Sequence, residues 1–196
     1  MKGLTLMLAV ACYGSAVWGA MFYFRTEDRG ARWGKRVISV AGGTGMIAAL
    51  ALLATSTSPP LPQAVAASAI YLASTALFWW AWRSTRQEVM QFAFSMQVPQ
   101  RLHVTGPYAL VRHPYYSSYV LSWTALAVAV PSVPTMASLA GMTGVYWMAA
   151  SAEERRIMRS PCADAYDRYR ADVGRFLPRL KPLYSILARE NRIPSR

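Results

Sequence analysis

The chain has 196 residues, of which 54% are hydrophobic and only 15% are charged, and it carries a net charge of +12. Soluble domains average about 25% charged residues, and a soluble nucleic-acid binder would be basic without long apolar runs. The composition therefore favours an integral membrane protein whose basic residues face anionic lipid.

The first predicted element is an apolar run over residues 4–24, about the length that crosses a bilayer. It is too long for the apolar part of a secretory signal peptide, and a basic segment follows it, so we predict a membrane span. A short loop with five basic residues is predicted over 25–36.

Residues 37–82 carry no charge at all, and the proline-rich stretch 58–62 divides them. Because helices rarely survive such a stretch, we predict a hairpin of two spans, over 37–57 and 63–82. Three tryptophans end the second span, where they are predicted to anchor it in the membrane interface: Trp79, Trp80 and Trp82.

Residues 83–100 are more polar and either continue this helix or lie in the interface, ending at Pro99. The loop after them carries the motif GPYALVRHPYY over residues 106–116. Residues 116–152 are again free of charge and are divided by Pro131 and Pro134. Each leg has about 15 to 18 residues, short for a full crossing, but both ends of this hairpin return to one face.

Residues 153–196 are predicted to form a cytosolic tail of short helices, broken at Pro161, Gly174 and Pro178. The positive-inside rule places 25–36, 83–115 and 153–196 in the cytoplasm, which leaves Lys2 as the only one of 21 basic residues outside. We therefore predict an all-α integral membrane protein with about five spans, its N-terminus outside and its C-terminus inside.

In this topology the motif and the pair Glu153-Glu154 meet at the cytoplasmic ends of one hairpin. A guanidinium at Arg112 and two carboxylates opposite it can bind both charges of a zwitterion. Taken singly, the residues have simpler interpretations: Arg112 can reach lipid phosphates, and Glu153 can pair with Arg156 one turn later. The hypothesis of a site depends on their meeting at one depth.

These residues resemble the isoprenylcysteine carboxyl methyltransferases and their phospholipid methyltransferase relatives, which are integral membrane enzymes that use S-adenosylmethionine. The matching motifs are GPYxxxRHPxY at 106–116, the pair Glu153-Glu154, Tyr166 with Tyr169, and RFLP at 175–178. The resemblance covers roughly residues 100–180. It implies a methyltransferase core over 101–196, preceded by transmembrane helices over 1–100.

The resemblance also implies roles for individual residues. Arg112, Glu153 and Glu154 would form the catalytic set, with Arg112 near the charged end of the cofactor and Glu154, rather than Glu153, holding its methionine portion. The backbone near His103 would lie along the adenosine. The full cofactor-binding set is His103, Val104, Gly106, Tyr108, Arg112, His113, Pro114, Tyr115, Tyr116 and Glu154.

Three departures from the family pattern concern the acceptor and the cofactor loop. Gln100 stands where relatives often carry a histidine, Ala149 and Ala150 where isoprenylcysteine enzymes carry an arginine, and Pro161-Cys162 where a Phe-Gly often precedes the tyrosines. The expected activity is methyl transfer to a lipophilic acceptor. The alternatives are N-methylation of phosphatidylethanolamine and a non-catalytic lipid-binding protein. We expect membrane lipids as partners, no nucleic acid and no metal, since there are only two histidines and no CxxC pair.

Overall fold

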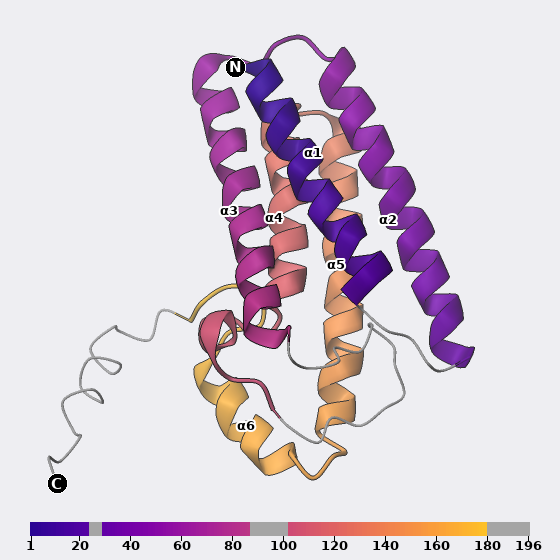
Figure 1. The fold of residues 1–196 in the computed structure, drawn as a ribbon, viewed down its shortest axis with the longest axis vertical. Coiled ribbons are helices and arrows are strands. Elements are labelled where there is room, and N and C mark those ends of the chain that lie inside the picture. The colour runs from indigo at the N-terminus through magenta and orange to yellow at the C-terminus, as the bar shows by residue number, and fades with distance from the viewer. Residues whose placement is uncertain (24–28, 87–101, 180–196) are drawn as a thin grey trace, which may run out of the picture.

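The computed structural model describes residues 1–23, 29–86 and 102–179, and within these ranges every regular element is a helix. Five long helices run side by side, and a short sixth helix lies at one end of the bundle (Figure 1). This confirms the predicted all-α fold. Parts of three predicted features lie outside the described residues. These are residues 25–28 of the basic loop 25–36, residues 87–100 of the polar stretch 83–100, and residues 180–196 of the tail 153–196.

Helix α1 covers Lys2–Trp18 and continues as a π-helical turn over Gly19–Tyr23. Helix α2 covers Arg29–Thr55. The prediction that the basic loop extends to residue 36 was therefore wrong, because arginine, lysine and alanine are good helix formers and carry α2 beyond its apolar part. Helix α3 covers Leu61–Thr85, and the prolines before it break the chain between α2 and α3, as predicted.

Helix α4 covers Pro114–Ala129 and α5 covers Val133–Ile157. The side chain of Ser132 caps the start of α5 and exchanges hydrogen bonds with Thr135. Glu153 and Glu154 belong to the last turns of α5, so the prediction that they open a separate tail was wrong. The run from Ala149 to Arg156 consists mostly of good helix formers, which continue the helix past the apolar segment. Helix α6 covers Ala163–Asp172, beyond the predicted break at Pro161.

The bundle is organised around α3 and α4, which pack along each other; α1 packs on α3, and α5 packs on α4. The core takes alanine, leucine and aromatic side chains from the five long helices, among them Leu53, Tyr71, Trp123 and Tyr146. Two apolar stretches, Lys2–Tyr23 and Leu61–Thr85, are long enough to cross a membrane, and Gly42–Thr55 is a shorter apolar helix.

Polar side chains also join the helices inside the bundle. The Thr5 and Ser68 hydroxyls lie 2.9 Å apart between α1 and α3. Trp79 donates its indole N–H to Ser15 at 3.0 Å and packs its ring on Trp18, whereas Trp80 is 45% exposed. Of the three predicted membrane anchors, Trp79 therefore fastens α3 to α1, and such interhelical hydrogen bonds replace the water that a bilayer lacks.

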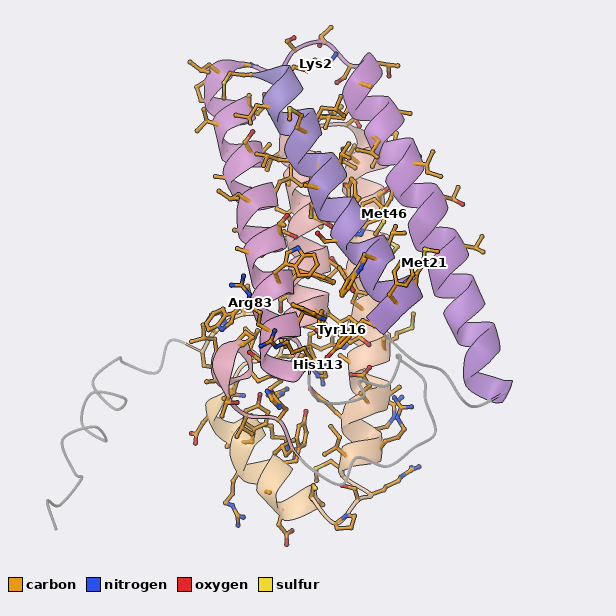
Figure 2. The ribbon with its side chains drawn as sticks, viewed as in Figure 1. Lys2, Met21, Met46, Arg83, His113 and Tyr116 are labelled. Carbon is orange, nitrogen blue, oxygen red and sulfur yellow. The ribbon has the colours of Figure 1, made fainter. Side chains whose placement is uncertain are left out.

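The two ends of the bundle differ in character. The N-terminus and the connection between α2 and α3 lie at one end, and α6 with the 106–116 motif lies at the other (Figure 1). Lys2 is accordingly far from His113 and Tyr116 (Figure 2). The ammonium of Lys2 donates to the carbonyl oxygens of Ala54 and Ser56, at 2.8 and 2.5 Å, and so satisfies the C-terminal end of α2.

Candidate functional site

The motif begins with a short 3₁₀ helix over Gly106–Ala109 that passes close to the end of α3. Gly106 has a φ of +61°, in the left-handed region, and a Cβ added there would collide with the hydroxyl of Ser84. Only glycine fits both requirements. Gly106 thus lets the loop cross α3 closely before it turns into α4.

The chain after α6 returns to this loop and holds its backbone. The amide of Arg112 donates to the carbonyl of Gly174 at 2.8 Å, and the amide of His113 donates to that of Arg175 at 3.2 Å. The hydroxyl of Ser117 donates to the carbonyl of Phe176 at 2.9 Å. We call residues 173–176 the return segment. It fixes the turn from which the motif side chains project.

Arg112 reaches from this turn to the end of α5. Its Nε and Nη2 donate to Oε1 of Glu154 at 3.2 and 3.0 Å. Its Nη1 donates to the carbonyls of Val173 and Arg170, at 2.7 and 3.2 Å. The side chains of Arg112 and Glu154 are only 9% and 10% exposed. The predicted meeting of motif and glutamate pair is thus present as a buried ion pair.

His113 lies between the two glutamates. Its Nε2 is 3.1 Å from Oε1 of Glu154, and its Nδ1 is 3.4 Å from Oε2 of Glu153. A neutral imidazole carries one N–H, so only the imidazolium can donate to both carboxylates. Burial by itself lowers the pKa of His113, but the hydrogen bonds and charges of the two glutamates outweigh it and raise this pKa above the usual value.

Glu154 lies past the apolar segment, which ends at Ala152. Its carboxylate contacts Arg112, His113 and Arg175. Burial by itself raises the pKa of Glu154, but hydrogen bonds from His113 and Arg175 and the charge of Arg112 outweigh it. The pKa of Glu154 is therefore held well below its usual value, and this carboxylate is ionised throughout the physiological range.

Tyr116 joins the second glutamate to the bundle. Its hydroxyl donates to Oε1 of Glu153 at 2.5 Å. The ring of Tyr116 stacks on His113 and on Tyr146, with centroids 5.6 and 5.7 Å apart. His113 and Tyr116 lie together at the lower end of the bundle, where α4 begins (Figure 2). The charged cluster is therefore continuous with an aromatic column between α4 and α5.

The remaining predicted cofactor residues surround this cluster but do not join it. Tyr108 is buried beside the ring of His103, 5.0 Å away, and its carbonyl accepts the hydroxyl of Tyr169 at 2.5 Å. Val104 is exposed, and Pro114 is fully buried at the start of α4. Tyr115 lies on another side of α4, where its hydroxyl is 3.2 Å from that of Thr85 and its ring packs on Phe78.

Sequence reasoning gave no role to Arg175, which contacts both oxygens of Glu154. The signal was present, because Arg175 opens the RFLP motif that supported the resemblance. Ala149 and Ala150, where isoprenylcysteine enzymes are expected to carry arginine, are fully buried. The cation beside this turn of α5 comes from the return segment instead.

The sequence model of the phospholipid methyltransferase family matches residues 61–161, slightly more than half of the chain. The chain belongs to this family. Its members are integral membrane methyltransferases and include the isoprenylcysteine carboxyl methyltransferases, which confirms the resemblance seen in the motifs. No curated protein and no solved structure gives a significant match.

The family match covers α3, the motif, α4 and all of α5, and hence both walls of the site. Methyltransferases of this family use S-adenosylmethionine. In the part of the chain that the structure describes, no group of three or more His, Cys, Asp or Glu side chains is placed to hold a metal ion. Family and apolar helices together identify a membrane protein.

Proposed function

We propose that the protein transfers the methyl group of S-adenosylmethionine to a lipophilic acceptor at the boundary between membrane and cytosol. One observation carries this proposal: Arg112 and His113 meet Glu153 and Glu154 in a buried cluster of mixed charge at the end of an apolar bundle. Such a cluster is costly to maintain at a membrane border without a ligand to bind.

The residues present fit the cofactor. Its amino-acid end is a zwitterion, and the cluster holds three cations, Arg112, His113 and Arg175, against two carboxylates. The guanidinium of Arg112 suits the cofactor's carboxylate, and a glutamate suits its ammonium. Val104 is exposed, so the loop before Gly106 is accessible for the adenosine to lie along it.

The geometry favours Glu153 over Glu154 as the partner of the ammonium. Glu154 already accepts hydrogen bonds from Arg112, His113 and Arg175 and is 10% exposed. Glu153 is 27% exposed. We therefore assign Glu153 the outward role and Glu154 the role of holding Arg112 in place, the reverse of the expectation drawn from the resemblance.

When bound, S-adenosylmethionine supplies an activated methyl on a sulfonium, which needs an in-line nucleophile and little acid–base chemistry. The protein's part is to hold the cofactor's charged end, fix the loop along its length and exclude water. A lipophilic acceptor enters from the bilayer, alongside the aromatic column of Tyr116 and Tyr146. We infer that α1 to α5 form five spans, and that the site lies on the cytoplasmic side.

Isothermal titration of the full chain in lipid nanodiscs with S-adenosylhomocysteine tests this function. We expect Arg112→Ala and Glu153→Gln each to weaken binding by at least about tenfold, since a charge-assisted hydrogen bond contributes about 1.5–3 kcal/mol. Asp167→Asn, on the exposed face of α6, is the matched control and should bind like the wild type. Absence of binding in the wild type would remove the proposed function.

The acceptor is identified by a separate assay. The protein is incubated with methyl-labelled S-adenosylmethionine and total membrane lipid, and the label is traced to alkali-labile esters or to phospholipid amines. Label in esters indicates a carboxylate acceptor, and label in phospholipid amines indicates N-methylation. No label in any fraction, despite cofactor binding, contradicts methyl transfer to a lipid.

A further inference from the structure

Arg175 lies outside the matched family segment, yet it makes the most extensive contact with Glu154. Its Nη2 donates to Oε2 of Glu154 at 2.5 Å, and its Nε donates to Oε1 at 3.1 Å. This is the two-pronged geometry in which a guanidinium binds a carboxylate most strongly. Arg112, by contrast, donates to only one oxygen of this carboxylate, Oε1.

The other contacts of Arg175 fix its direction. Its Nη1 donates to the hydroxyl of Ser151 at 3.1 Å, and its guanidinium lies 4.2 Å from the ring centre of Trp147. Ser151 and Trp147 lie on the last turns of α5 before Glu154. The guanidinium is thus held against one helix face, with a stacking partner on one side and a hydroxyl on the other.

The backbone of Arg175 is equally constrained. Its carbonyl accepts the amide of His113, and its neighbour Gly174 accepts that of Arg112. A side chain at position 174 would collide with the carbonyl of Leu177, so the tight course of the chain here requires glycine. The same short segment therefore fixes both the motif turn and the carboxylate that faces it.

We propose that Arg175 is a positioning residue: it holds the Glu154 carboxylate in the orientation that directs the Arg112 guanidinium to the anionic end of the cofactor. This inference rests on the proposed function and adds the return segment, which lies outside the matched residues 61–161, to a site whose other two walls lie within them. Without Arg175, Oε2 of Glu154 loses the hydrogen bond that the structure gives it, and the carboxylate is free to rotate away from Arg112.

The test is the affinity of the full chain for S-adenosylhomocysteine between pH 3 and pH 8, measured for Arg175→Gln, Arg175→Lys and the control Arg179→Gln. Arg179 is exposed and bonds only to a carbonyl of α6 in the described residues. We expect roughly tenfold weaker binding for Arg175→Gln, the size usual when a group that orients a binding side chain is lost.

The pH profile separates positioning from a merely structural role. The groups that face Glu154 are Arg112, His113, Arg175 and Tyr166. Removing one cation raises the pKa of Glu154, so in Arg175→Gln the loss of binding at acid pH should begin at a higher pH than in the wild type. Arg175→Lys keeps the charge but not the two-pronged geometry, so it should restore the wild-type pH profile and only part of the affinity.

Each outcome decides the proposal. Unchanged affinity and an unchanged acid limb in Arg175→Gln overturn it, while leaving the proposed function intact as long as the wild type binds. If Arg175→Gln does not fold, Arg175→Lys carries the test: wild-type affinity in that variant overturns the proposal, and a loss of several-fold with an unchanged pH profile supports it. A wild type that does not bind removes the proposed function itself.

Discussion

At the scale of single residues, His113 is the centre of the charge network. Its two nitrogens face Glu153 and Glu154, its ring stacks on Tyr116, and Phe176 packs against its edge. Two carboxylates so close together repel each other unless a cation lies between them. The imidazolium supplies that cation, so His113 is expected to hold the glutamate pair together rather than to act as a base.

The sign of the pH dependence follows from the raised pKa of His113. A group whose pKa is higher in the folded state stabilises the fold fully below its usual value, about 6.5, and loses that contribution as the pH rises through the folded value. Thermal unfolding of the wild type should therefore show a falling midpoint as the pH rises above about 6.5. His113→Gln should be less stable at pH 6 by about 2 kcal/mol and lack this slope.

The control for that experiment is His103→Gln, which retains His113 and should keep the slope. Glu154 titrates in the opposite sense: its pKa is lowered, so its contribution is complete above about 4.5 and fades only as the pH falls further. The window from pH 6.5 to pH 9 therefore reports on His113 and not on Glu154. Identical slopes in wild type and His113→Gln would contradict the bridging role.

At the scale of elements, the motif is joined to the first helix by a chain of hydroxyls. Tyr23, at the end of the π-helical turn, donates its hydroxyl to Thr85, whose carbonyl and Oγ1 both lie 2.7 Å away. The Thr85 hydroxyl in turn lies 3.2 Å from that of Tyr115. α1 lies outside the family match, yet through α3 it supports the start of α4, where the motif ends.

Tyr23→Phe removes this support without leaving a cavity. We expect a loss of about 1 kcal/mol in unfolding free energy, or about 2–4 °C in thermal midpoint for a chain of this size. Thr85→Val should cost more, because it removes the hydroxyl that lies between those of Tyr23 and Tyr115 and that also donates to the carbonyl of Ala81. Tyr119→Phe is the control, since the Tyr119 hydroxyl makes no hydrogen bond in the described ranges, and it should unfold like the wild type. Equal midpoints in all variants would show that the hydroxyl chain contributes nothing.

At the scale of the whole molecule, the sequence was sufficient to predict the helical bundle. It also predicted the contact of Arg112 with the glutamates, but not that of Arg175 with Glu154. Apolar length and proline breaks predicted the long helices, and hairpin geometry predicted that Arg112 meets the glutamates. Helix ends were missed at Arg29 and Ile157, because charged helix formers continue a helix past its apolar part.

Two features of the site depend on tertiary contacts that no local pattern encodes. Tyr115 and Tyr116 are about 100° apart around α4, so only one of them can face the glutamates. The hydroxyl of Tyr115 faces Thr85 instead, a residue thirty positions earlier in the chain. Arg175 reaches Glu154 only because of the path that the chain takes after α6. Such contacts depend on packing between segments distant in sequence, which periodicity does not report.

The placement of charge along the whole bundle leads to a topological prediction. Lys2 lies at one end, where it donates to the carbonyls of Ala54 and Ser56, and His113 lies at the other (Figure 2). His113 shares the carboxylate of Glu154 with Arg112 and Arg175. Basic residues are retained on the cytoplasmic face. The test uses a Cys162→Ser background, in which the remaining native cysteine, Cys12, is buried. In this background Ser58→Cys, at an exposed position, should react with a membrane-impermeant maleimide in intact cells. A cysteine at exposed Asp164 should react only after the membrane is permeabilised, and the reverse labelling pattern would place the site on the outer face and contradict cytosolic entry of the cofactor.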